Sequence, residues 1–205
     1  MPRKARGWKT EVISRKVHIA RKTRETDVVL TLDPDAPGGG QVRTGLPFFD
    51  HLLSSMAFHG RFHLEIDAKG DLEVDPHHLV EDTGLVLGQA LCEVLAKTQQ
   101  VKRFAHTVIP MDEALAEVTI DVCGRSTLVW RVRLPQKRAG AFDLWLLREF
   151  FDGLVSQARI SLHVEVRRGR NSHHMVEAVF KALGKSLRES YAPAEGEMSS
   201  KGRIG

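Results

Sequence analysis

Short alternating runs of apolar and polar residues separate longer stretches with helical spacing, and this order occurs twice along the chain. Alternation over a few residues predicts strands, whereas apolar residues three or four apart predict helices. In the first half the predicted strands cover 11–20, 27–32 and 62–66, and the predicted helices cover 48–58 and 77–97. In the second half the strands cover 114–122, 127–134 and 160–166, and the helices cover 142–157 and 173–190. Each half therefore has the order strand, strand, helix, strand, helix.

The repeated order predicts an internal duplication and an α+β fold. A sheet with helices on one face leaves an apolar helix surface that must be covered. Packing the helices of both halves together, with one sheet on each outer side, covers these surfaces in an α/β sandwich. We expect the first half to span residues 1–100 and the second half 101–192, followed by a polar C-terminal tail over 193–205.

The tetrad His-His-x-x-Glu opens the last predicted helix of each half, at residues 77–81 and 173–177. Residues four apart share a face of an α-helix, whereas adjacent residues point about 100° apart. The first histidine of each tetrad can therefore bind one ion together with the glutamate, while the second histidine points elsewhere. Imidazole and carboxylate without thiolate suit a hard or borderline divalent metal. Two such tetrads at matching places in a repeat predict a paired metal site.

The tetrads supply six candidate ligands, which are His77, His78, Glu81, His173, His174 and Glu177. Either each helix binds its own ion, or the two helices face one another and share the ions. Sharing is favoured, because the second histidine of each pair points away from its own chelate. The preceding helix of each half offers one further ligand, which is His51 in the first half and Glu149 in the second.

Composition and charge limit the class of protein. The 205 residues, 42% of them apolar and 27% charged, have the composition of a globular protein. The net charge of +4 favours an anionic small molecule, and the sequence has no dense basic helix or aromatic–basic surface for nucleic acid. It also has no secretory signal and no apolar run of about 18 residues that would span a membrane. We therefore expect a cytoplasmic protein, in which Cys92 and Cys123 are reduced thiols.

Five phrases in a fixed order carry a resemblance to a known family: residues 44–53, 75–82, 110–115, 171–174 and 199–202, which read TGLPFFDHLL, DPHHLVED, PMDEAL, NSHH and SSKG. In these phrases the chain resembles imidazoleglycerol-phosphate dehydratase of histidine biosynthesis. The resemblance implies a hydro-lyase that converts imidazole glycerol phosphate to imidazole acetol phosphate with two manganese ions per active site. It also implies a ribosomal protein S5 domain 2-like fold with mostly four-stranded sheets, and a homo-oligomeric 24-mer built from trimers.

Carried over by position, the resemblance divides the candidate ligands between two ions. One ion would be held by His51, His78, His173 and Glu177, and the other by His77, Glu81, Glu149 and His174. Glu149 departs from the histidine that is frequent at this position in the family, although a carboxylate can also bind manganese. The resemblance assigns acid–base catalysis to Glu25 and counts Glu81 and Glu177 as catalytic too. The substrate would contact Glu25, His59, Arg103, Arg125, Lys181, Ser199, Ser200 and Lys201. The arginines and lysines among these residues suit a phosphate group.

Two other interpretations of the residues remain open. A dinuclear metallohydrolase also uses paired ions, and Asp50, Asp82 or Asp112 could supply its bridging carboxylate. A metal-storage or assembly protein would bind metal without turnover, but it would need neither an acid–base residue nor a cationic tail. Members of the family are sometimes fused to a histidinol-phosphate phosphatase. Since the segment before the first repeat is too short for one, we expect a monofunctional enzyme.

Overall fold

The computed structural model describes residues 14–98, 100–196 and 198, and the same order of elements occurs in it twice. The first repeat consists of β1 (Val17–Lys22), β2 (Thr26–Asp33), β3 (Val42–Arg43), α1 (Pro47–Gly60), β4 (His63–Gly70) and α2 (His77–Ala96). The second consists of β5 (Phe104–Met111), β6 (Ala114–Asp121), β7 (Thr127–Arg131), β8 (Arg138–Ala139), β9 (Phe142–Asp143), α3 (Leu146–Ala158), β10 (Ser161–Arg168) and α4 (Ser172–Ser190).

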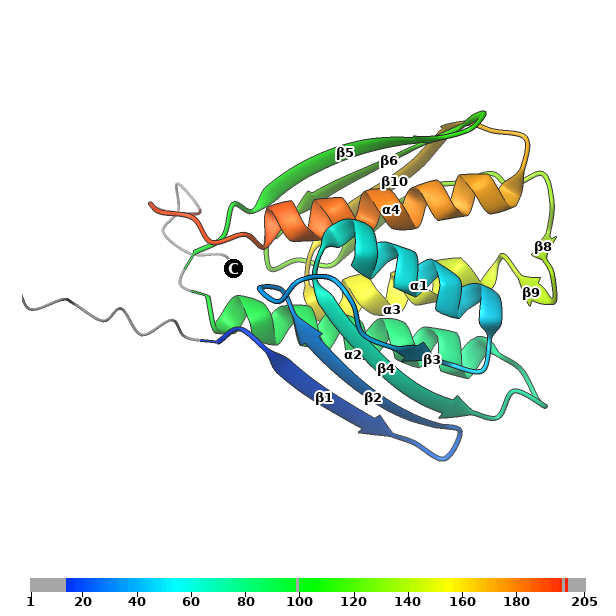
Figure 1. The fold of residues 1–205 in the computed structure, drawn as a ribbon, viewed down its shortest axis with the longest axis horizontal. Coiled ribbons are helices and arrows are strands. Elements are labelled where there is room, and N and C mark those ends of the chain that lie inside the picture. Colours follow the sequence, from blue (N-terminus) through cyan, green and yellow to red (C-terminus); the bar gives the residue numbers. More distant parts are fainter. Residues whose placement is uncertain (1–13, 99, 197, 199–205) are drawn as a thin grey trace, which may run out of the picture.

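Each repeat forms one four-stranded sheet, in the orders β1-β2-β4-β3 and β5-β6-β10-β7. Three strands of each sheet are antiparallel, and the short last strand runs parallel to its neighbour. The four long helices lie between the two sheets (Figure 1). In β2 and β6 every second residue is buried, because successive side chains point to opposite faces of a strand. The predicted α+β sandwich with two four-stranded sheets is confirmed.

The helices pair across the repeats, α2 against α3 and α1 against α4. A Cβ atom on Gly88 of α2 would come within 2.4 Å of the carbonyl oxygen of Leu154 on α3. A Cβ atom on Gly184 of α4 would come within 2.1 Å of the carbonyl oxygen of Met56 on α1. Glycine is therefore required at both crossings for the backbones to approach this closely. At each crossing, a helix that begins with a His-His-x-x-Glu tetrad packs against a helix of the other repeat. That second helix carries the additional candidate ligand, which is Glu149 on α3 and His51 on α1.

Equivalent helix ends align the two repeats residue by residue. Both α1 and α3 are followed by an arginine C-cap in the left-handed conformation, Arg61 and Arg159, each with a φ of 53°. Counting the same ten positions back from each cap leads to His51 and Glu149. These two residues therefore occupy equivalent positions in the duplicated fold.

The structure differs from the sequence prediction at several strands. Strand β5 was not expected, because its alternation directs Phe104, which is 61% exposed, and Val108 towards the outside rather than the core. The predicted helix over 142–157 begins only at Leu146, since residues 142–143 pair with β8 and the Arg138 guanidinium binds the Asp143 carboxylate at 2.6 Å. The start of the predicted strand over 11–20, up to residue 13, lies outside the described residues.

The segment that follows α4 packs against the protein. Tyr191 is buried, and the Ala194 N–H donates to the Gln100 carbonyl oxygen at 3.0 Å.

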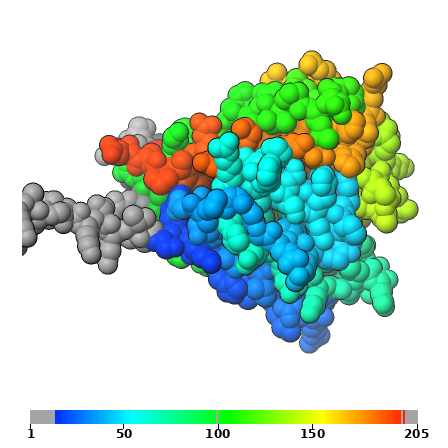
Figure 2. Space-filling view, in the orientation of Figure 1, coloured from blue at the N-terminus to red at the C-terminus, as the bar shows by residue number. Residues whose placement is uncertain are grey.

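In the space-filling view, α1 lies across the face of the molecule between the two sheets (Figure 2). None of the helices in the described part of the chain is long and apolar enough to cross a membrane.

Candidate metal centre

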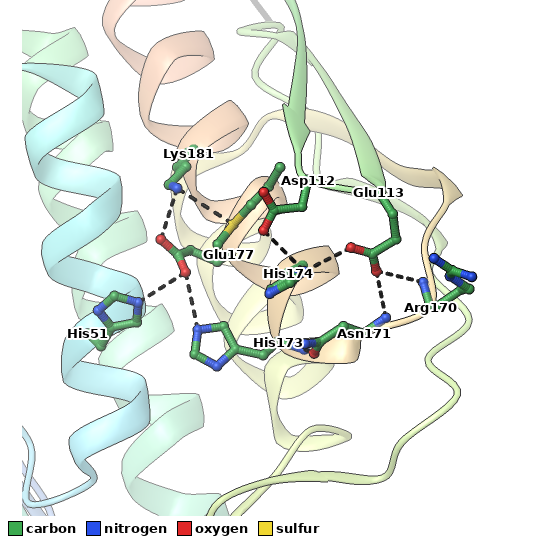
Figure 3. A network of polar contacts seen from close by, with 10 residues as sticks. His51, Asp112, Glu113, Arg170, Asn171, His173, His174, Glu177 and Lys181 are labelled. Atoms are coloured by element: carbon green, nitrogen blue, oxygen red, sulfur yellow. Dashed lines mark hydrogen bonds and ion pairs between the residues drawn. The ribbon is translucent and has the colours of Figure 1, made fainter.

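Three candidate ligands meet where α1 crosses the start of α4 (Figure 3). The Nε2 atoms of His51 and His173 each lie 3.2 Å from Oε2 of Glu177. Among the described residues, these three form the one group of three or more such side chains whose donor atoms all lie within 4.8 Å of one another. His173 and Glu177 are four residues apart on α4, as the tetrad predicts, and His51 comes from the other repeat. We call His51, His173 and Glu177 the first set.

The carboxylate of the first set is held in its ionised form. Burial opposes ionisation of Glu177, but hydrogen bonds from Lys181 and His51 lower its pKa to about 2. Lys181 Nζ lies 2.9 Å from Oε1 of Glu177, whereas the two histidines face the other carboxylate oxygen, Oε2. A buried carboxylate that stays charged and faces two imidazoles is a suitable ligand for a divalent cation.

The loop before α4 caps the helix that carries the second tetrad. The side chain of Asn171 accepts a hydrogen bond from the His173 backbone N–H at 3.0 Å and so caps the helix. The ring of Phe48 meets the His173 ring edge-on at 5.0 Å between centroids. Both rings line a cavity of about 1120 Å³ that also reaches Arg138 and Arg170. The first set therefore opens into a space large enough for a small molecule.

A second group lies at the matching crossing of α2 and α3. His77 Nε2 is 3.5 Å from Oε2 of Glu81 and 3.9 Å from Oε2 of Glu149. The indole of Trp145 packs edge-on against the His77 ring at 5.7 Å between centroids. We call His77, Glu81 and Glu149 the second set. As in the first set, a chelate from a tetrad is joined by a side chain of the other repeat.

The second histidine of each tetrad is turned away from both sets and fixed by a carboxylate. His78 Nδ1 lies 3.2 Å from Asp71, and His174 Nδ1 lies 2.9 Å from Glu113. These hydrogen bonds raise the pKa of both histidines above the ordinary value. With Nδ1 engaged, Nε2 is the ring atom that remains to accept a metal, and a carboxylate on the other nitrogen is the usual partner of a metal-binding histidine. The sequence did not indicate these roles of Asp71 and Glu113.

The predicted catalytic and phosphate-binding residues are dispersed within one chain. Glu25 is exposed on the turn between β1 and β2, close enough to His78 for its charge to raise that pKa. His59 lies near Lys181, and burial together with that positive charge lowers its pKa. Arg103 is at the other end of α4, where its guanidinium binds the Asp121 carboxylate at 2.7 Å and the Met198 carbonyl oxygen at 2.8 Å.

Arg125 and three residues of the C-terminal tail were also predicted to contact the substrate. Arg125 lies in the turn between β6 and β7, and its carbonyl oxygen is 3.6 Å from Cys123 Sγ. It is therefore at the same end of the second sheet as Arg103, and not beside Lys181. The predicted contacts Ser199, Ser200 and Lys201 lie outside the described residues.

Comparison with known proteins identifies the family. A family model described as imidazoleglycerol-phosphate dehydratase matches residues 44–187. The curated enzyme of that name from Geobacter metallireducens is 45% identical over 195 residues, which cover 94% of this chain and 100% of the relative. The one from Bacillus licheniformis is 47% identical over 176 residues, covering 86% and 91%.

Solved structures agree with the sequence comparison. Crystal structures of imidazoleglycerol-phosphate dehydratase from Staphylococcus aureus and Pyrococcus furiosus match with TM-scores of 0.80, at 34% and 35% identity. The matches cover 87% and 90% of this chain and 99% of each of those chains. The chain belongs to the imidazoleglycerol-phosphate dehydratase family, hydro-lyases of histidine biosynthesis.

Proposed function

We propose that the enzyme converts D-erythro-imidazole glycerol phosphate to imidazole acetol phosphate and water, with two manganese ions in each active site, in the cytoplasm. The observation that carries this proposal is the first set, in which an ionised, buried carboxylate faces two imidazole nitrogens within 4.8 Å. Donor sets of imidazole and carboxylate without thiolate suit Mn²⁺. His51, His173 and Glu177 would hold one ion, and His77, Glu81 and Glu149 the other.

Each set would be completed by a second copy of the chain. His78 and His174 do not join the three-residue group within the described part of one chain, yet both have Nδ1 bound to a carboxylate. Such histidines are oriented to offer Nε2 to a metal. We assign His78 to the first ion and His174 to the second, each reaching across to a neighbouring copy. Closed assemblies with shared sites of this kind agree with the expected 24-mer built from trimers.

The dispersed substrate contacts support the same assembly. Glu25 is close enough to His78 for its charge to raise the pKa of that histidine, so the copy that contributes His78 would also bring Glu25 towards the reacting carbon. Glu25 would then act as the acid–base group that removes a proton next to the carbon losing hydroxide, a role worth about 10² to 10⁴ in rate. Bound ions supply Lewis acidity and a template for the imidazole ring. Lys181, Arg103, Arg125, His59 and the segment Ser199, Ser200 and Lys201 would hold the phosphate end.

One assay distinguishes this function from the two alternatives. The manganese-loaded protein is incubated with imidazole glycerol phosphate, and both imidazole acetol phosphate and inorganic phosphate are measured. We expect the ketone to form with no release of phosphate. Phosphate release without ketone would indicate a metallohydrolase. Tight metal binding with no turnover of either kind would indicate a storage or assembly protein.

A further inference from the structure

The two candidate metal positions are related by the internal duplication, yet their side chains are chemically different. The left-handed C-caps Arg61 and Arg159 align the repeats so that His51 on α1 is equivalent to Glu149 on α3. The tetrads themselves are the same in both repeats. The two sets therefore differ in donor type at this one pair of equivalent positions, where His51 offers an imidazole and Glu149 offers a carboxylate.

This exchange alters both the donor atoms and the charge. Within one chain the first set offers two imidazoles and one carboxylate, and the amine of Lys181 lies 2.9 Å from that carboxylate. The second set offers one imidazole and two carboxylates, Glu81 and Glu149, around His77. Before any ion binds, the first set with its lysine is close to neutral, whereas the second carries two negative charges. Adding one histidine to each, as proposed above, leaves this difference unchanged.

The two sets also differ in packing. Glu177 has a side chain only 10% exposed, and its Oε2 is 3.2 Å from both imidazoles of the first set. In the second set the side chain of Glu81 is 45% exposed, and the distances from His77 Nε2 to the two carboxylates are 3.5 and 3.9 Å. The first set is therefore the more compact and has the more sheltered carboxylate, although its two histidines are as exposed as Glu81, and the second set is better supplied with oxygen.

We propose that the two metal positions differ in ion preference, and that Glu149 sets this difference. Imidazole-rich sites suit zinc and the later transition metals, whereas carboxylate-rich sites suit manganese and magnesium. The first set therefore exchanges manganese for zinc readily, and the second set retains manganese. The enzyme can hold one ion of each kind. This inference rests on the proposed two-manganese function and adds the ion preference of each position.

The experiment uses the assembled protein loaded with manganese and freed of excess metal. Zinc is added in steps, and the manganese that leaves is followed by electron paramagnetic resonance. We expect two steps, with half of the bound manganese leaving at low zinc and the other half only at much higher zinc. Anomalous scattering at the manganese and zinc edges, from crystals taken between the two steps, should place zinc at His51 and manganese at Glu149.

A variant and a matched control test the role of Glu149. Glu149→His gives the two sets the same donor atoms, although the second set has Leu85 where the first has Lys181, so the two steps should move together at low zinc. Glu189→His changes an exposed glutamate on α4 that is not part of either set, and it should keep both steps. If the unmodified protein releases all its manganese in one step, or if zinc enters the second set first, the inference is wrong while the manganese function stands. If the protein retains no manganese at all, the proposed function itself fails.

Discussion

The carboxylate of Glu113 lies 2.9 Å from Nδ1 of His174, although the two residues are far apart in the sequence. Hydrogen bonds from His174 and from the backbone N–H groups of Arg170 and Asn171 lower the pKa of Glu113 to about 2. The glutamate is thus fixed at the start of α4 and holds the imidazole in one orientation. Asp71 stands in the same relation to His78 in the first repeat. A carboxylate therefore supports this histidine in both repeats, although Asp71 follows β4 whereas Glu113 lies between β5 and β6.

Replacing Glu113 by Ala should weaken manganese binding by about 10- to 100-fold, the usual cost of losing a residue that orients a metal ligand. The change leaves His174 in place but frees its ring to rotate. The measurement is manganese affinity by calorimetry. Glu117→Ala is the matched control, because Glu117 pairs with His106 at 2.9 Å on the outer face of the second sheet, away from both sets. Equal affinities in the Glu113 variant and the unmodified protein would remove the orienting role.

Acid should release the metal by protonating the histidines and not by protonating Glu177. Because hydrogen bonds to Asp71 and Glu113 raise the pKa of His78 and His174, both rings bind protons more readily than ordinary histidines. Metal needs the neutral ring, so manganese should leave as the pH falls through the histidine range. Glu177, with a pKa of about 2, should still be ionised at that point. Manganese retained until Glu177 protonates would contradict this order.

The stability of the metal-free fold should depend on pH in the opposite sense for the two kinds of group. The raised pKa values of His78 and His174 add stability that is complete below the ordinary histidine value and is lost as the pH rises through the raised values. The lowered pKa of Glu177 adds stability that is present above the ordinary glutamate value and is lost as the pH falls towards about 2. Urea unfolding of the stripped protein across this range should show both trends. A stability independent of pH would contradict them.

Replacing Glu25 by Gln should lower turnover by about 10² or more while manganese content and substrate affinity stay close to those of the unmodified enzyme. The amide keeps the size of the side chain but cannot transfer the proton. Metal analysis and steady-state kinetics on the same preparation separate the two properties. A variant that keeps most of its turnover would exclude Glu25 from the acid–base step.

Helical spacing and the repeat were enough to predict the tetrad helices, and the sandwich followed from covering their apolar faces. The orienting carboxylates were not predictable in this way, because Asp71 and Glu113 come from loops whose approach to α2 and α4 depends on the finished fold. The same limit applies to Trp145, which reaches His77 only once α3 crosses α2. Strand β5 was missed because Phe104 reverses the usual alternation by facing outward.

The central claim is that two copies of the chain complete each metal site, so that metal and assembly are linked. An ion that binds only the assembled state stabilises it by RT ln(1 + [L]/Kd), about 2.7 kcal/mol when the ion is at a hundredfold excess over Kd. Losing a shared histidine should therefore impair assembly, whereas losing a histidine that is not a proposed metal ligand should not. His174→Ala is the test variant, and His18→Ala, on the exposed face of β1, is its control.

Sedimentation of the protein, first stripped with EDTA and then supplied with manganese, tests this claim most directly. We predict that the stripped protein sediments as a smaller species such as the trimer, and that manganese restores the large particle in the unmodified protein and in His18→Ala but not in His174→Ala. A fully stripped protein that keeps its large size, or a His174→Ala variant that reassembles normally, would contradict the shared site.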